Sequence, residues 1–99
     1  MTTAQINNYK LNTERMALVR TMMADRRSTT EIMRAISNNY NDISFATEND
    51  FFNWLETTND AIQSYLKSYA AELKQAGKTV SQIAEIIGRS EAYVNLILN

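Results

Sequence analysis

Apolar residues recur at intervals of three and four along most of the chain, with polar residues between them. This spacing is typical of amphipathic helices. The longest stripe, in the segment 59–76, contains Ile62, Tyr65, Leu66, Tyr69, Ala70 and Leu73. Shorter stripes, together with the cap residues that precede them, predict further helices at 13–25, 29–36, 47–55, 79–87 and 90–98.

Residues 1–12 are polar and carry no such stripe, so we expect them to form a loosely held N-terminal arm. Proline is absent and glycine is limited to two residues, which favours helices joined by few sharp loops. A chain of 99 residues with 44% hydrophobic residues can bury one small core. The sequence therefore predicts an all-α fold, a compact bundle of about six helices in a single domain over residues 13–99.

The segment 79–98 has the strongest local signals in the chain. Thr79 and Gln82 make a capping box at the start of its first helix. Gly88 follows the last apolar residue of that helix, where a left-handed residue ends a helix at little cost, and Ser90 is a natural N-cap for the next helix. The residues expected to face inward are Ile83, Ile86 and Ile87 in the first helix, and Val94, Ile97 and Leu98 in the second.

This segment resembles the helix-turn-helix superfamily of DNA-binding proteins. The run from Ile83 to Ser90, followed by Tyr93 and Val94, is similar to the units of plasmid-partition ParB-type and phage-repressor-type proteins. Such units place their second helix in the major groove of DNA. The resemblance, which covers about a fifth of the chain, implies a sequence-specific DNA-binding transcriptional regulator of the small phage, plasmid or bacterial type.

The resemblance also implies which side chains contact DNA. They are Thr79, Ser81, Arg89, Ser90, Glu91, Ala92, Tyr93 and Asn95. Thr79 and Ser81 would touch phosphate. Asn95 would contact adenine through both polar atoms of its amide, and Arg89 would bind phosphate or guanine. One such unit buries little surface, so we expect a homodimer on double-stranded DNA with a two-fold symmetric site.

The last helix also fits another function, that of a protein-binding adaptor or inhibitor that keeps the scaffold without binding DNA. This helix is strongly apolar, and Leu96 lies on or near the face that a reading helix turns to the groove. Glu91 repels phosphate unless it accepts from a cytosine amino group. The formal net charge of −1 and the pI of about 5.3 contrast with the basic character of most DNA-binding domains. Both interpretations stay open.

A weak internal repeat predicts two helix-turn-helix units in tandem, with chance alignment of capped helices as the alternative. Residues 29–36 align with 80–87, and residues 47–55 align with 90–98 after a longer, asparagine-rich turn. The second surface would contain Arg26, Arg27, Arg34 and the cap region at Glu48 and Asn49. The acidic residues of this cap region repel DNA phosphates, so a supporting or partner-binding role suits this surface better than DNA recognition.

The residue types exclude most catalytic chemistry. Histidine and cysteine are absent, which removes the usual general base, the usual nucleophile pairs and the common zinc ligands. There is no calcium-loop spacing and no glycine-rich phosphate loop. We therefore expect no enzyme activity, no cofactor and no metal. No run is long enough to span a bilayer and no signal-peptide pattern is present, so we expect a cytoplasmic protein without membrane association.

Overall fold

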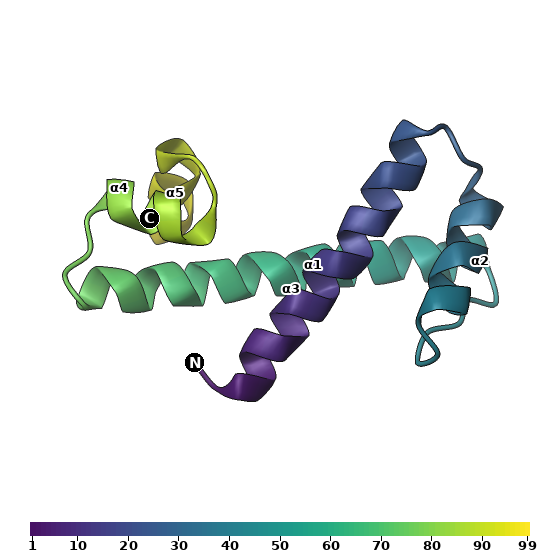
Figure 1. Cartoon of the computed structure of the whole chain (residues 1–99), viewed down its shortest axis with the longest axis horizontal. Helices are drawn as coiled ribbons and strands as arrows, with labels where there is room; N and C mark the ends of the chain where they lie inside the picture. The colour runs from purple at the N-terminus through teal and green to yellow at the C-terminus, as the bar shows by residue number, and fades with distance from the viewer. The chain divides into compact units, whose positions relative to one another are not determined.

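The computed structural model describes residues 1–99 and shows an all-α protein without strands (Figure 1). Its five helices are α1 (Thr3–Ala24), α2 (Thr29–Asn39), α3 (Glu48–Gln75), α4 (Val80–Ile87) and α5 (Glu91–Leu98). The predicted all-α class is therefore confirmed. No helix combines the length and the apolar character that a bilayer span requires.

Contacts group the chain into two compact units. The N-terminal unit comprises Thr2–Ile62, and the C-terminal unit comprises Gln63–Asn99 together with Met1. The boundary falls within α3, so the first part of this helix belongs to the N-terminal unit and the rest to the C-terminal unit. The single domain expected over residues 13–99 stays a prediction.

The number of helices is five and not about six, because the helices expected at 47–55 and 59–76 are one continuous helix, α3. Asn59 and Asp60, at the start of the segment 59–76, are residues that often cap a helix start. They lie inside α3, where no glycine or proline interrupts the backbone before them. Residues that can cap a helix are also tolerated in its interior, so a cap signal alone does not fix a helix boundary.

The helix expected to begin at Thr13 begins at Thr3 instead, so most of the segment expected to be a loose N-terminal arm is helical. Thr2 and Gln5 make a capping box that starts the helix. The Gln5 N–H donates to the Thr2 hydroxyl at 3.1 Å, and the Thr2 N–H donates to the Gln5 side-chain oxygen at 2.9 Å. This start depends on polar groups, which an apolar stripe does not reveal.

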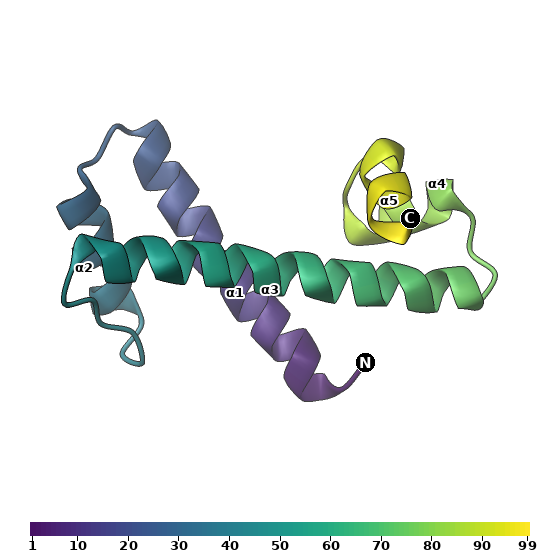
Figure 2. The same cartoon turned by 180° about the vertical axis from the view of Figure 1, so that it is seen from behind.

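The N-terminal unit has a core of aliphatic and aromatic side chains. Its buried members are Val19, Ile32, Ile36 and Phe51. Phe45, in the loop before α3, meets Phe51 edge-on with ring centroids 5.3 Å apart, and meets Trp54 in the same way at 5.5 Å. Figure 2 shows α1 and α2 joined by a short turn, and these two helices pack on each other.

A buried arginine fastens the loop after α2 to α1. One guanidinium nitrogen of Arg15 lies 2.7 and 2.9 Å from the two carboxylate oxygens of Asp42. The guanidinium carbon lies 4.6 Å from the centre of the Tyr40 ring, and the Tyr40 hydroxyl donates to Glu14 at 3.1 Å. The hydrogen bond from Arg15 lowers the pKa of the Asp42 carboxyl. A buried charge of this kind is costly without its partner, so the pair holds the loop in place.

Asp42→Asn is expected to lower the free energy of unfolding at neutral pH and to flatten its decline in acid. A carboxyl whose pKa is lower in the folded chain than in the unfolded chain stabilises the fold above the unfolded pKa, and this contribution is lost as pH falls through the folded pKa. For Asp42 the loss therefore lies below about pH 4, the ordinary carboxyl range. Urea unfolding at neutral and acidic pH measures the difference. The same acid dependence in both proteins would contradict the role of the Arg15–Asp42 pair.

The first helix ends at an arginine in the left-handed conformation. Arg26 has φ +59° and is the only residue other than glycine with a positive φ. The Arg26 N–H bonds the Met23 carbonyl and the Arg27 N–H bonds the Met22 carbonyl, both at 3.0 Å. Glycine is the usual residue at such a corner, because a Cβ atom there costs on the order of 1 kcal/mol.

Arg26→Gly is therefore expected to raise the free energy of unfolding by about 0.5–1 kcal/mol. The matched change in the opposite direction is Gly77→Ala, at the corner after α3. Gly77 has φ +89° and open space where a Cβ would stand, so backbone strain alone should lower stability by about 1 kcal/mol. Urea unfolding measures both variants. If Arg26→Gly lowered stability, the arginine side chain would have to make a stabilising contact that outweighs the strain.

The two units share the same order of local features. A left-handed residue, Arg26 in one unit and Gly77 in the other, follows the first helix. Two positions later, Ser28 and Thr79 begin the next helix with complete capping boxes. Three pairs aligned by the internal repeat are buried, namely Ile32 with Ile83, Ile36 with Ile87, and Phe51 with Val94. The other two pairs, Trp54 with Ile97 and Leu55 with Leu98, are half-buried. Aligned positions of the two segments therefore have similar burial.

Candidate nucleic-acid interface

The first helix of the 79–98 segment forms where its cap predicts. Thr79 is the N-cap of α4, and its hydroxyl accepts from the Gln82 N–H at 3.2 Å. The Thr79 N–H donates to the Gln82 side-chain oxygen at 3.0 Å, so the predicted capping box is confirmed. The buried residues of α4 are Ile83, Ala84 and Ile87.

One apolar residue of α4 does not face inward. Ile86 was expected beside Ile83 and Ile87 in the core, but its exposed fraction is 46%. A helix has 3.6 residues per turn, so residues 83 and 87 lie nearly in line while residue 86 is turned to the side. The surface of the C-terminal unit therefore carries an isoleucine.

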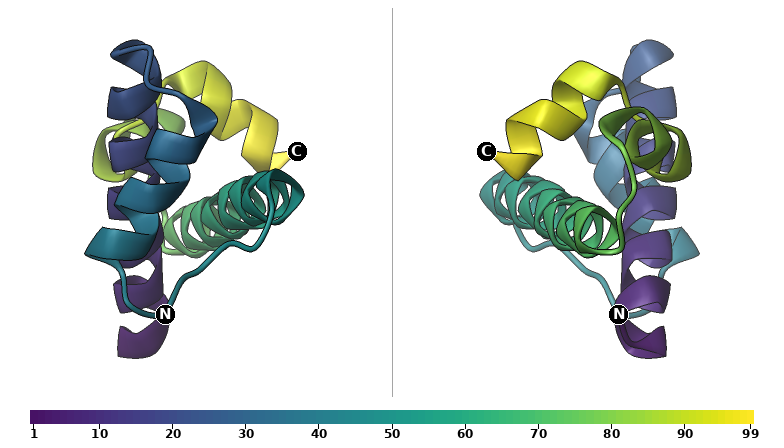
Figure 3. Two further views of the ribbon diagram at one scale, coloured as in Figure 1. Left: turned by 90° about the vertical axis from the view of Figure 1, so that its right-hand side faces the viewer. Right: turned by 90° about the vertical axis from the view of Figure 1, so that its left-hand side faces the viewer.

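The two helices meet at the predicted glycine turn. Gly88 is the C-cap of α4 with φ +70° and ψ +35°. The N–H groups of Gly88 and Arg89 both bond the Ala84 carbonyl. Ser90 is the N-cap of α5, and its hydroxyl accepts from the Tyr93 N–H at 3.1 Å. α4 and α5 pack on each other and run in clearly different directions (Figure 3).

The last helix has one buried face and one exposed face. Val94 is fully buried, while Tyr93, Ile97 and Leu98 are half-buried. The opposite face carries Glu91, Ala92, Asn95 and Leu96, which are all exposed. Leu96 is the most exposed large apolar residue of the chain at 72%. The helix is thus anchored on one side only, and a continuous strip of its surface is open to a partner.

The structure places the eight expected DNA contacts in three places. Thr79 and Ser81 are exposed in the first turn of α4, and Arg89 and Ser90 are exposed in the glycine turn. The exposed face of α5 brings together Glu91, Ala92 and Asn95, which are spaced for one side of a helix. Tyr93 is half-buried, and its ring centre lies 5.8 Å from the Arg89 guanidinium carbon, within the range of a cation–π contact.

The capping bonds leave the two N-cap hydroxyls able to donate. Thr79 and Ser90 each accept a backbone N–H, which uses a lone pair of the hydroxyl oxygen and not its hydrogen. Each hydroxyl can therefore still donate to an anionic oxygen. Phosphate contacts of this kind position a protein on DNA without reading the sequence.

The net charge of the C-terminal unit is more positive than that of the N-terminal unit. Residues 63–99 contain four lysines or arginines and three acidic residues, whereas residues 2–62 contain six and eight. The four cations, Lys67, Lys74, Lys78 and Arg89, are exposed and form no ion pair. Lys78 was not among the expected contacts, although it directly precedes the N-cap Thr79. The sequence signal that points to Lys78 is its place directly before Thr79, a residue expected to touch phosphate.

Comparison with protein-family models, with curated proteins and with solved structures gave no match for this chain.

Proposed function

We propose that the chain binds double-stranded DNA through the turn at Gly88 and the exposed face of α5, as a small sequence-specific transcriptional regulator of phage, plasmid or bacterial type. The observation that carries the proposal is the exposed strip of Glu91, Ala92, Asn95 and Leu96 on a helix held by a glycine turn. An exposed helix presented in this way fits the reading helix of a helix-turn-helix unit. The resemblance of residues 79–98 to such units supports the same assignment.

Each group has a chemical role in this proposal. The Asn95 amide has a donor and an acceptor that match the N6 and N7 atoms of adenine. Arg89 contacts phosphate or guanine, and Lys78 with the hydroxyls of Thr79 and Ser90 contacts the backbone. Leu96 lies next to Asn95 on the exposed face, where an apolar side chain meets the methyl group of thymine. A homodimer provides the second half of the interface on a two-fold symmetric site.

The test is selection from a pool of random duplexes, followed by fluorescence anisotropy across a range of salt concentrations. We expect enriched sequences. We also expect the logarithm of the binding constant to fall linearly with the logarithm of the salt concentration, with a slope of about −0.9 for each phosphate neutralised. A matched random duplex gives the non-specific reference. The proposal fails if no sequence is enriched and no duplex is bound at low salt by the folded protein.

A protein-binding adaptor is the second candidate, and the exposure of Leu96 at 72% and of Ile86 at 46% favours it. In this function the apolar residues of the C-terminal unit dock a protein, and the chain leaves DNA unbound even at low salt. Leu96→Glu then disrupts the protein complex while the far-ultraviolet circular dichroism spectrum stays the same. Salt-sensitive binding to a selected duplex would decide against this function.

A further inference from the structure

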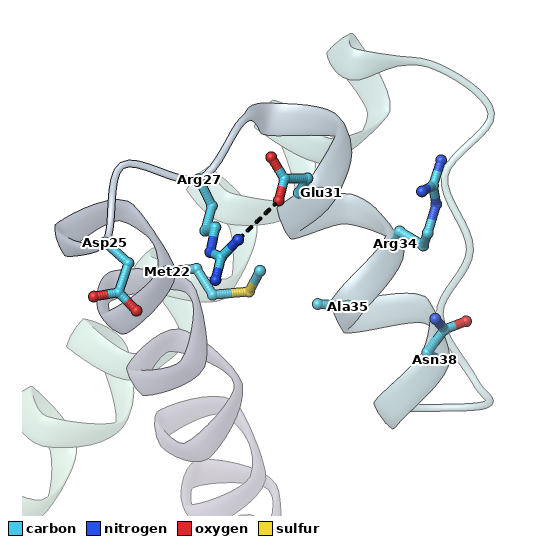
Figure 4. A pocket seen from close by; sticks show the side chains of 7 residues that line it. All are labelled: Met22, Asp25, Arg27, Glu31, Arg34, Ala35 and Asn38. Carbon is cyan, nitrogen blue, oxygen red and sulfur yellow. Dashed lines mark hydrogen bonds and ion pairs between the residues drawn. The ribbon is translucent and has the colours of Figure 1, made fainter.

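Two arginines of the N-terminal unit each have a carboxylate partner. Arg15 lies 2.7 and 2.9 Å from the two carboxylate oxygens of Asp42. Arg27 forms an ion pair with Glu31 at 3.4 Å, and Figure 4 shows this pair at the open hollow between the end of α1 and α2. Any other anion that binds either arginine must compete with a carboxylate that is already in place.

Arg89, in the C-terminal unit, has an aromatic partner instead. Its guanidinium carbon lies 5.8 Å from the centre of the Tyr93 ring, and the side chain forms no ion pair. Two exposed glutamates, Glu85 and Glu91, are close to it in sequence. Glu85 is four residues before Arg89, the usual spacing of a helical ion pair, but the left-handed Gly88 ends α4 between them. The positive charge of Arg89 is therefore open to an external anion.

Arg89 is held at both ends. Its backbone N–H bonds the Ala84 carbonyl at 3.0 Å, which fixes the residue at the glycine turn. Tyr93 lies in the first turn of α5, where its own N–H donates to the Ser90 hydroxyl at 3.1 Å, and its ring is half-buried. The ring is thus anchored in the protein, and the attraction between its face and the guanidinium restricts the long arginine side chain.

This contact leaves the binding groups of the arginine available. A cation–π attraction acts on the positive charge and does not require the five N–H donors of the guanidinium. A side chain that is ordered before binding loses less conformational entropy when it meets a phosphate or a base. The arrangement therefore suits an arginine that binds an anion or a hydrogen-bond acceptor outside the chain.

We infer that Tyr93 is a positioning residue, whose ring holds the Arg89 guanidinium at the exposed turn for phosphate or guanine. The inference rests on the proposed function, and it gives Tyr93 an indirect role in place of the direct DNA contact that the resemblance implies. The half-buried state of the ring favours the indirect role, because part of its surface is already covered by the protein.

The test is fluorescence anisotropy of the full chain on the selected duplex, with three variants. Tyr93→Leu removes the ring but keeps apolar bulk, and it should weaken binding about two- to fivefold, the worth of an exposed cation–π contact. Tyr93→Phe keeps a ring face and should bind as the wild type does. In an Arg89→Ala background, Tyr93→Leu should cause no further loss, because the ring then has no cation to hold.

A second measurement needs no DNA. The ring current of Tyr93 should shift the nuclear magnetic resonance signals of the Arg89 side-chain protons in the free protein. We expect this shift in the wild type and in Tyr93→Phe, and its loss in Tyr93→Leu. The matched control is Tyr69→Leu, which removes another half-buried tyrosine of the C-terminal unit and should change neither the Arg89 signals nor the affinity. Circular dichroism establishes that every variant keeps its helices.

The outcomes separate this inference from the proposed function. If the wild type binds no duplex, the proposed function fails and the inference fails with it. If the wild type binds and Tyr93→Leu binds equally well, the inference alone fails. A loss in Tyr93→Phe as large as that in Tyr93→Leu, or an additional loss in the double variant, would show that Tyr93 acts on DNA without Arg89 and would overturn the positioning role.

Discussion

Phe51→Ala is expected to lower the free energy of unfolding by about 3–5 kcal/mol. Phe51 is 1% exposed and lies in the buried cluster of the N-terminal unit. Its ring packs edge-on against Phe45 with ring centroids 5.3 Å apart, and stacks on Trp54 at 6.1 Å with the two ring planes inclined by 22°. Truncation removes the apolar burial of the ring, the contacts between the rings and the packing of the aliphatic neighbours around them. Urea unfolding followed by circular dichroism measures the loss.

The adjacent residue provides the control. Phe52 has the same side chain on the same helix but is 47% exposed, so Phe52→Ala should change the free energy of unfolding by about 0.5 kcal/mol or less. Because a small domain is stable by only about 5–15 kcal/mol, the two variants are easily told apart. Equal losses would show that the buried cluster is not what holds the N-terminal unit together.

The second large effect is expected on DNA binding. Asn95→Ala removes a two-point contact to adenine, which is worth about 1–3 kcal/mol of discrimination against other bases. The selected duplex should therefore lose roughly 5- to 150-fold in affinity, while a random duplex is bound nearly as before. Arg89→Ala, if the arginine binds phosphate, should weaken both duplexes alike and reduce the salt slope by about 1. Fluorescence anisotropy on the two duplexes measures both effects.

Matched controls exist for both substitutions. Asn59→Ala removes an exposed asparagine from α3, and Lys67→Ala removes an exposed, unpaired cation from the same helix. Neither residue belongs to the candidate interface, so both variants should bind the selected duplex as the wild type does. Losses as large in the controls as in Asn95→Ala and Arg89→Ala would mean that the interface has been placed on the wrong residues.

The sequence predicted those parts of the fold that local chemistry decides. The Thr79–Gln82 capping box, the left-handed Gly88 and the N-cap Ser90 each depend on residues close together in the chain, and all three are confirmed. The joining of two expected helices into α3 was not predictable in this way. Asn59 and Asp60 have the same chemistry at a helix start and in a helix interior, so only the surrounding structure decides between these positions.

The candidate site was predictable to a similar degree. Helical spacing alone places Glu91, Ala92 and Asn95 on one side of α5, and the structure leaves that side exposed. Burial depends on contacts between elements, so the exposure of Ile86 could not be predicted from its apolar character. The DNA contacts themselves depend on a partner and stay predictions.

The most direct measurement is nuclear magnetic resonance of the nitrogen-15-labelled chain during titration with a selected duplex. We predict that the backbone signals which shift belong to the first turn of α4, the turn at Gly88 and the exposed face of α5, with Asn95 among the most affected. Signals of the N-terminal unit should move much less, and a duplex of scrambled sequence should reproduce only the phosphate-contact part of the pattern. Shifts confined to residues 2–62, or an unchanged spectrum at low salt, would contradict the assignment of this surface to DNA.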